Sequence, residues 1–146
     1  MPKVLEGLLI STDKTKLDVD YIHQVLSHSY WAKGIPVEVI LKSIEGSLCF
    51  GIYDHDNQVG FARVITDKAT FAYLADVFVD QGYRHQGIAK ILMRSILAEP
   101  ELQGLRRFML ATRDAHGLYR QFGFEPLTNP QYMMQIHKPD LYESMA

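Results

Sequence analysis

The sequence predicts a mixed β-sheet with helices packed on its faces, in the α/β or α+β class. Segments with strand-like alternation and segments with helical spacing succeed one another in the order β-α-α-β-β-β-α-β-α-β-β. The 146 residues, 47% of them hydrophobic, suit one domain over residues 1–146, with a core large enough to fold without disulfides.

The first part of the chain is expected to contain one strand and two helices. Leu5 to Ser11 is apolar enough for a strand, and Val19 to Leu26 has helical spacing after the capping candidate Asp18. Residues 30–36 then form a loop. Its last residue is a proline, which is tolerated at a helix start and is expected to open a helix over residues 36–44.

The middle of the chain is expected to contain three strands. They cover Leu48 to Tyr53, Gln58 to Thr66 and Thr70 to Val79. The polar residues 54–57 form a hairpin loop between the first two strands, and residues 67–69 supply the next turn.

The second half begins with the most amphipathic helix, whose apolar residues recur at helical spacing over residues 88–97. Phe108 to Thr112 is expected to be a strand and Ala115 to Gln121 a short helix. Phe124 to Leu127 and Tyr132 to Ile136 are expected to be terminal strands.

Composition argues against several kinds of partner. The net charge is -2 and the basic residues are scattered, so no nucleic-acid surface is expected. No segment has the roughly 20 apolar residues of a membrane span, and the N-terminus does not resemble a signal peptide, so a cytoplasmic protein without membrane contact is expected. The six histidines lack metal-site spacing, so no metal is expected. Cys49, the only cysteine, lies in an apolar run typical of a core thiol, with a reactive role as the alternative.

The segment from Val79 to Lys90 joins an apolar strand to the most amphipathic helix. Gly87 and Ala89 sit at the helix start, where small residues let a ligand approach backbone N–H groups that have no partner within the helix. Because these groups carry the positive end of the helix dipole, a pyrophosphate is a suitable ligand. The segment has neither a Walker A nor a Rossmann motif, and an ordinary strand-to-helix turn is the alternative.

Residues 84–89, Arg-His-Gln-Gly-Ile-Ala, match the [Arg/Gln]-x-x-Gly-x-[Gly/Ala] signature, and the chain here resembles the GNAT acetyltransferase superfamily. Residues 73–79 look like that family's fourth strand, 108–112 like its fifth, and 118–124 like its Leu-Tyr-x-x-x-Gly-Phe element. The resemblance implies a mixed, mostly antiparallel sheet of six to seven strands, flanked by about four helices and splayed between strands 4 and 5.

The resemblance also implies an acetyl-CoA (coenzyme A) site. The pantetheine arm would lie in the splay as an added strand, and the pyrophosphate would meet backbone N–H groups of the signature loop. Asp114 stands where many relatives carry Asn. The cofactor-binding residues implied in this way are Val77, Phe78, Val79, Arg84, His85, Gln86, Gly87, Ile88, Ala89 and Asp114.

Catalysis is assigned by the same resemblance. Tyr119 matches the tyrosine that commonly protonates the CoA thiolate, and a core tyrosine is the alternative. Polyamine-type relatives carry a Glu where this chain has Ala75, so Asp76 is the candidate for base or ammonium-binding group, with a structural carboxylate as the alternative. Tyr30, Trp31 and Tyr73 are the candidates for the acceptor pocket, where an aromatic pair could hold a cation. For Tyr30 and Trp31 the alternative is a hydrophobic plug between the helices and the sheet.

The expected function is transfer of the acetyl group of acetyl-CoA to a small-molecule or peptide amine, by direct attack in a ternary complex. A catalytically inactive CoA-binding sensor is the alternative, because the usual Glu is absent. A binding domain without a CoA site is a third interpretation. Many relatives pair through terminal strands, so the resemblance also allows a homodimer.

Overall fold

The computed structural model of the chain describes residues 6–145, in which five strands form one sheet. In sheet order these strands are β1 (Leu8–Ser11), β2 (Leu48–Asp54), β3 (Asn57–Thr66), β4 (Phe71–Val79) and β5 (Arg107–Leu110). The pairs from β1 to β4 are antiparallel, and β5 lies parallel to β4 at the edge. The predicted mixed, mostly antiparallel sheet is therefore confirmed.

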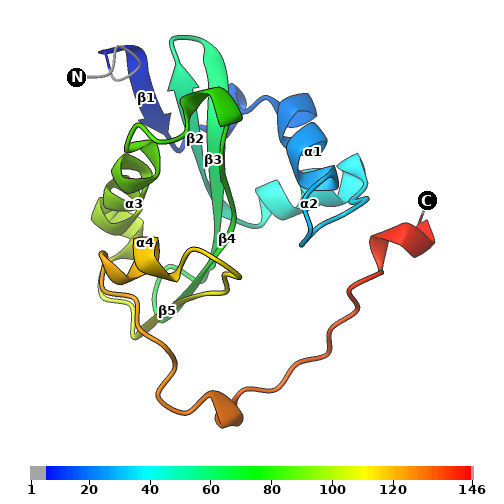
Figure 1. Ribbon diagram of the computed structural model, residues 1–146, viewed down its shortest axis with the longest axis vertical. Coiled ribbons are helices and arrows are strands. Elements are labelled where there is room, and N and C mark those ends of the chain that lie inside the picture. Colours follow the sequence, from blue (N-terminus) through cyan, green and yellow to red (C-terminus); the bar gives the residue numbers. More distant parts are fainter. Residues whose placement is uncertain (1–5, 146) are drawn as a thin grey trace.

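In the described part of the chain, four α-helices cover the two faces of the sheet. They are α1 (Val19–Ser27), α2 (Val37–Glu45), α3 (Ile88–Ala98) and α4 (His116–Arg120). Figure 1 shows α1 and α2 on one face and α3 and α4 on the other. Each face has its own core, because successive strand residues point to opposite sides. Phe50 is buried with Leu92 beneath α3, whereas its neighbour Cys49 is buried with Ile40 beneath α2.

The predicted helices and central strands are present with small shifts at their ends. Pro36 caps α2 from outside rather than occupying its first turn. The loop between β2 and β3 is tighter than predicted, because Asp54 already pairs with Asn57 and His55 adopts a left-handed φ of 57°. Of the predicted first strand, Leu5 lies outside the described residues. Among those residues no helix is long and apolar enough to cross a bilayer.

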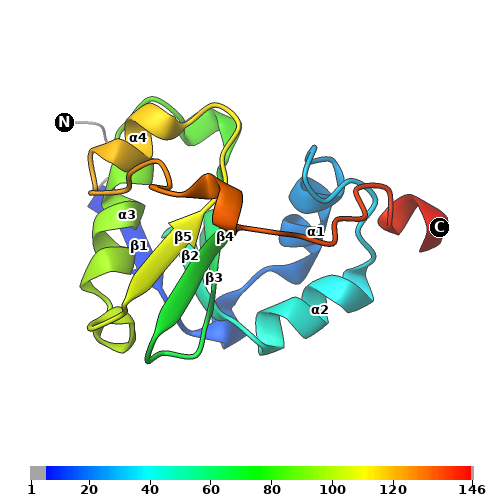
Figure 2. The same ribbon diagram turned by 90° about the horizontal axis from the view of Figure 1, so that it is seen from below.

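The two predicted terminal strands are wrong for this structure, and the described sheet has five strands rather than six or seven. Residues 124–127 and 132–136 pair with no strand of the described chain. They run instead along and then away from β5, toward α1 and α2 (Figure 2). A strand exists only through hydrogen bonds to a neighbour, so alternation of side chains alone does not form one. Pro126 also removes one backbone donor from the first of these segments.

Candidate active site

The centre of the site is a bulge in β4, beyond which β4 and β5 separate. Arg63 of β3 lies opposite Ala75 and Phe61 lies opposite Phe78, so β4 holds one extra residue in this interval. Asp76, inside the bulge, has a left-handed φ of 57°. Pairing between β4 and β5 ends at Leu74 and Leu110, although β4 continues to Val79. Within residues 6–145, the far part of β4 therefore presents an unpaired backbone edge.

The signature loop lies directly at the end of this edge. Gly87 immediately precedes α3 with a φ of 78°, which favours glycine, and a Cβ built there meets nothing within 4 Å. No side chain caps the helix, so the N–H groups of its first turn are available to an anion. The Arg84 side chain turns back, and its Nε donates to the Val79 carbonyl oxygen at 3.1 Å.

Nine of the ten predicted cofactor-binding residues gather in two adjoining places, and the tenth, Asp114, lies apart from them in the loop between β5 and α4. Val77, Phe78 and Val79 form the end of β4, and residues 84–89 form the loop and the start of α3. The Phe78 side chain is buried against α1 and α2, so a ligand at this edge would meet its backbone rather than its ring.

Tyr119 lies on α4 with 8% of its surface exposed, and its ring packs edge-on against Phe124 at a centroid distance of 6.0 Å. Burial raises the pKa of Tyr119 above its ordinary value, and the nearby Tyr30 and Asp114 raise it further. A phenol in this state keeps its proton at neutral pH and can act as a donor. The structure thus brings the predicted acid close to Tyr30, a residue of the predicted acceptor pocket.

The acceptor side is held together by contacts between distant segments. Trp31, from the loop between α1 and α2, donates from Nε1 to Oδ1 of Asp76 at 2.9 Å. Arg63 of β3 donates from Nε to Oδ2 of Asp76 at 2.7 Å, and its other nitrogen donates to Ser47. The Asp76 and Arg63 side chains are only 10% and 16% exposed. Both oxygens of the bulge carboxylate are therefore engaged by protein donors.

The aromatic pair is also fixed in place. The rings of Tyr30 and Trp31 meet edge to face at 5.0 Å, and the Arg113 guanidinium carbon lies 3.8 Å from the Tyr30 ring centre. Tyr73 is half-buried on β4 between Ile65 and Met109.

Sequence reasoning missed Arg63 and Arg113. Arg63 had a visible signal, because it is the one charged residue in the apolar run from Val59 to Ile65. For Arg113 nothing in the sequence pointed to Tyr30, because the contact joins two loops that are far apart along the chain, one between α1 and α2 and the other between β5 and α4.

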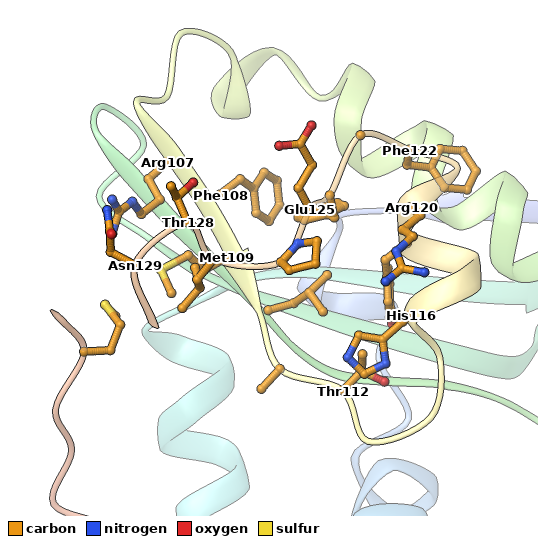
Figure 3. Close-up of a pocket in the computed structure, with 18 of the residues that line it drawn as sticks. Arg107, Phe108, Met109, Thr112, His116, Arg120, Phe122, Glu125, Thr128 and Asn129 are labelled. Carbon is orange, nitrogen blue, oxygen red and sulfur yellow. The ribbon is translucent and has the colours of Figure 1, made fainter. Parts of the chain in front are cut away.

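Two hollows border these residues. One of about 900 Å³ runs along the outer edge of β5 and reaches α4, and Tyr119 lies in its wall. Figure 3 shows His116 in the same wall. The other, of about 670 Å³, lies at the end of β4 between Tyr21, Val79 and Arg84. Neither hollow spans the gap where β4 and β5 separate. The site is therefore defined by the unpaired backbone edge of β4 rather than by either hollow. Among the described residues, no cluster of His, Cys, Asp or Glu is suited to a metal ion.

Comparisons with known proteins agree on one family. The family model for the acetyltransferase (GNAT) domain matches residues 45–126, more than half of the chain. A Gibberella zeae protein, assigned as an acetyltransferase by prediction, is 33% identical, with the match covering 76% of this chain and 75% of the relative.

Solved structures extend the similarity to nearly the whole chain. A protein of Xanthomonas campestris pv. campestris, assigned to the GNAT family with its acetyltransferase activity also a prediction, is 50% identical at a TM-score of 0.92, covering 97% of this chain and 98% of its own. A Clostridium acetobutylicum structure with acetyl-CoA shares the fold at a TM-score of 0.66 and 10% identity, covering 89% of this chain and 96% of its own.

Proposed function

The chain belongs to the GNAT acetyltransferase family, and from that premise we propose that it transfers the acetyl group of acetyl-CoA to a primary amine. The observation that carries the proposal is the unpaired β4 edge from Ala75 to Val79, which ends at the uncapped start of α3. An extended ligand with amide groups can hydrogen-bond to such an edge, and its phosphates can meet the N–H groups of the helix.

The residues present fit acetyl-CoA. Gly87 leaves open space where any other residue would place a Cβ, so a pyrophosphate can approach the backbone there. Arg84 and Lys90 add positive charge on either side of Gly87. When bound, acetyl-CoA supplies an acetyl group on a thioester, which an amine can attack directly. Backbone groups of Val77 and Val79 would orient it, and Asp114 would border it near α4.

Tyr119 is the proposed acid. Its hydroxyl would give its proton to the departing thiolate sulfur, and burial favours the protonated phenol needed for that role. Its closeness to Tyr30 supports this assignment, because the acid and the acceptor pocket must meet at the reacting atoms.

We propose that Asp76 acts on the acceptor side by holding the Trp31 and Arg63 side chains in place. It binds the Trp31 indole and the Arg63 guanidinium, and thereby fixes the aromatic pair beside the bulge. Its role as the base that takes the amine proton remains a prediction. A pH profile of kcat for Asp76→Asn separates the two roles, because loss of the base removes the acidic limb whereas loss of a positioning residue lowers kcat and leaves the limb in place.

The decisive experiment is calorimetric titration of the protein with acetyl-CoA, repeated on Gly87→Glu. Gly104→Glu is a matched control, because Gly104 has a similar φ of 73° and equally open surroundings but lies far from the signature loop in the sequence. Binding that only Gly87→Glu abolishes would support a pyrophosphate site at the loop. Failure of the wild-type protein to bind acetyl-CoA would contradict the proposal.

Turnover is tested by following thiol release with a panel of amines. Tyr119→Phe should lower kcat by roughly 10²-fold or more, as loss of a general acid does. Tyr53→Phe, which removes a buried hydroxyl of β2 that has no hydrogen-bond partner in the described structure, is the control. If acetyl-CoA binds but no amine causes release of the thiol, the chain is instead a CoA-binding module without catalysis. The alanine at position 75 would then explain the lack of turnover.

A further inference from the structure

A cation from the loop between β5 and α4 lies beside the proposed acceptor pocket. The Arg113 guanidinium carbon is 3.8 Å from the centre of the Tyr30 ring, which belongs to the loop between α1 and α2. The two loops face each other in Figures 1 and 2. The helix α4, which carries Tyr119, begins three residues after Arg113, and Tyr30 is close enough to Tyr119 to raise the pKa of its phenol. The cation is therefore a neighbour of the proposed acid.

The charge of Arg113 has no partner in the described chain. Within residues 6–145 its side chain makes no ion pair or hydrogen bond, and the carboxylate of the next residue, Asp114, does not pair with it. Arg113 is exposed, with one face of its guanidinium over the Tyr30 ring. The N–H groups of a guanidinium point outward in its own plane, so stacking on a ring leaves them free. Arg113 therefore keeps its donors for a ligand.

The buried carboxylate of the pocket is already balanced. Asp76 accepts hydrogen bonds from Arg63 at 2.7 Å and from Trp31 at 2.9 Å, and its side chain is only 10% exposed. Because the Arg63 guanidinium offsets its charge, a second ammonium group on an acceptor would gain little from Asp76. The positive Arg113 is the charge beside the aromatic pair that remains for an acceptor. This arrangement favours an acceptor that is anionic away from its amine.

We infer that the acceptor is a small amine that carries a carboxylate, and that Arg113 binds this carboxylate. This rests on the proposed acetyl transfer, whose acceptor class it narrows. A guanidinium and a carboxylate can form two parallel hydrogen bonds, so the contact orients the acceptor as well as attracting it. The rings of Tyr30 and Trp31, which are 54% and 45% exposed, offer an apolar surface to the rest of the molecule. The amine can then point toward Tyr119.

The product of this reaction is an amide that keeps the carboxylate, as in an N-acetyl amino acid. The amine nitrogen forms a bond to the acetyl carbon, and the bond between that carbon and the sulfur breaks. Overall the amine loses one N–H proton and the sulfur gains one, so no further reactant is needed. The carboxylate takes no part in these bonds and serves in recognition.

The first test compares acceptors that differ only in the carboxylate. Thiol release is followed with amino acids and with their primary amides. For the wild type, kcat/KM should be roughly tenfold or more higher for the acids, as a charge-assisted contact with two hydrogen bonds provides. Basicity cannot produce this preference, because the amine of an amide has the lower pKa, about 8, and is more often neutral at pH 7.

The variants assign the preference to Arg113. Arg113→Met should lose it through a higher KM for the acids, while the KM for the amides stays unchanged. Arg113→Lys keeps the charge without the two parallel donors, so it should retain part of the preference. Arg94→Met is the matched control, because Arg94 is exposed on α3, on the face of the sheet opposite α1 and α2. All three changes are at exposed positions, so circular dichroism should stay that of the wild type.

Binding is measured apart from turnover by the fluorescence of Trp31, the only tryptophan. N-acetyl amino acids should change it at concentrations roughly tenfold lower than their amides do, and Arg113→Met should remove this difference. A wild type that treats acids and amides alike in both measurements would overturn the inference, as would a preference that survives Arg113→Met. Failure to bind acetyl-CoA would contradict the proposed function instead, and the fluorescence titration would still decide whether Arg113 binds a carboxylate.

Discussion

Replacing Asp76 with Asn tests whether the carboxylate at the β4 bulge holds the acceptor side together. Asn is nearly the same size and tolerates the left-handed backbone at this position, so the change isolates the charge. The carboxylate accepts hydrogen bonds from Arg63 at 2.7 Å and Trp31 at 2.9 Å. An amide has one accepting oxygen, so at least one of these bonds is lost and the Arg63 charge is left without its partner.

The size of the effect follows from burial. Breaking a buried ion pair costs about 3–5 kcal/mol, and a hydrogen bond to a charged group contributes about 1.5–3 kcal/mol. With 16% of its side chain exposed, Arg63 regains some hydration, so we expect a loss of about 2–4 kcal/mol in the free energy of unfolding. For an m-value of about 2 kcal/mol/M, the urea midpoint falls by about 1–2 M.

The assay is urea unfolding, followed by circular dichroism and by fluorescence of Trp31, the only tryptophan. The native fluorescence of Asp76→Asn should change, because the Trp31 indole loses or weakens its partner. Asp56→Asn, at an exposed turn, should change the stability by less than about 0.5 kcal/mol. Adding Arg63→Met should recover part of the loss, since it removes the unpaired charge. An Asp76→Asn midpoint equal to that of Asp56→Asn, or strictly additive losses in the double variant, would refute the argument.

Three further predictions concern the fold. The buried Tyr53 hydroxyl has no hydrogen-bond partner in the described structure, so Tyr53→Phe should leave the free energy of unfolding unchanged or raise it by up to about 1 kcal/mol; a loss above 1 kcal/mol in urea unfolding would contradict this. Asp67 accepts hydrogen bonds from Ala69, Thr70 and Phe71, which lower its pKa, so its stabilising effect should be present above pH 4 and fade as the pH falls. The gap in urea midpoint between wild type and Asp67→Ala should therefore shrink from pH 7 to pH 2, and a constant gap would count against the carboxylate. Burial raises the pKa of Cys49 to about 11, so the folded protein should resist alkylation at pH 8 and react rapidly once unfolded in urea; equal rates would contradict a core thiol.

The position and type of most elements were predictable because their signals are local. The α3 prediction over residues 88–97 agrees with the observed Ile88–Ala98, since a helix forms its hydrogen bonds within four residues and its apolar spacing records the buried face. The hairpin between β2 and β3 was predictable for a similar reason, because its turn residues lie between two alternating runs. The signature loop with Gly87 was also predictable, because its signature lies within consecutive residues.

The acceptor side was only partly predictable. Asp76 and Tyr30 were singled out from the sequence, whereas their partners Arg63 and Arg113 were not. The Arg63–Asp76 contact depends on the register between β3 and β4, and the bulge shifts this register by one residue. No spacing rule along the chain gives that shift.

By itself, the sequence determined the order of the elements as far as α4 and the glycine-containing loop before α3, and it singled out the candidate acid. The tertiary structure decided which groups meet: the bulge that opens β4, the carboxylate shared by Arg63 and Trp31, and the absence of a partner for residues 132–136 in the described subunit. The physical reason is the range of the interactions. Helical periodicity and turn geometry are encoded over a few residues, whereas a strand or an ion pair requires a partner that only the folded chain supplies.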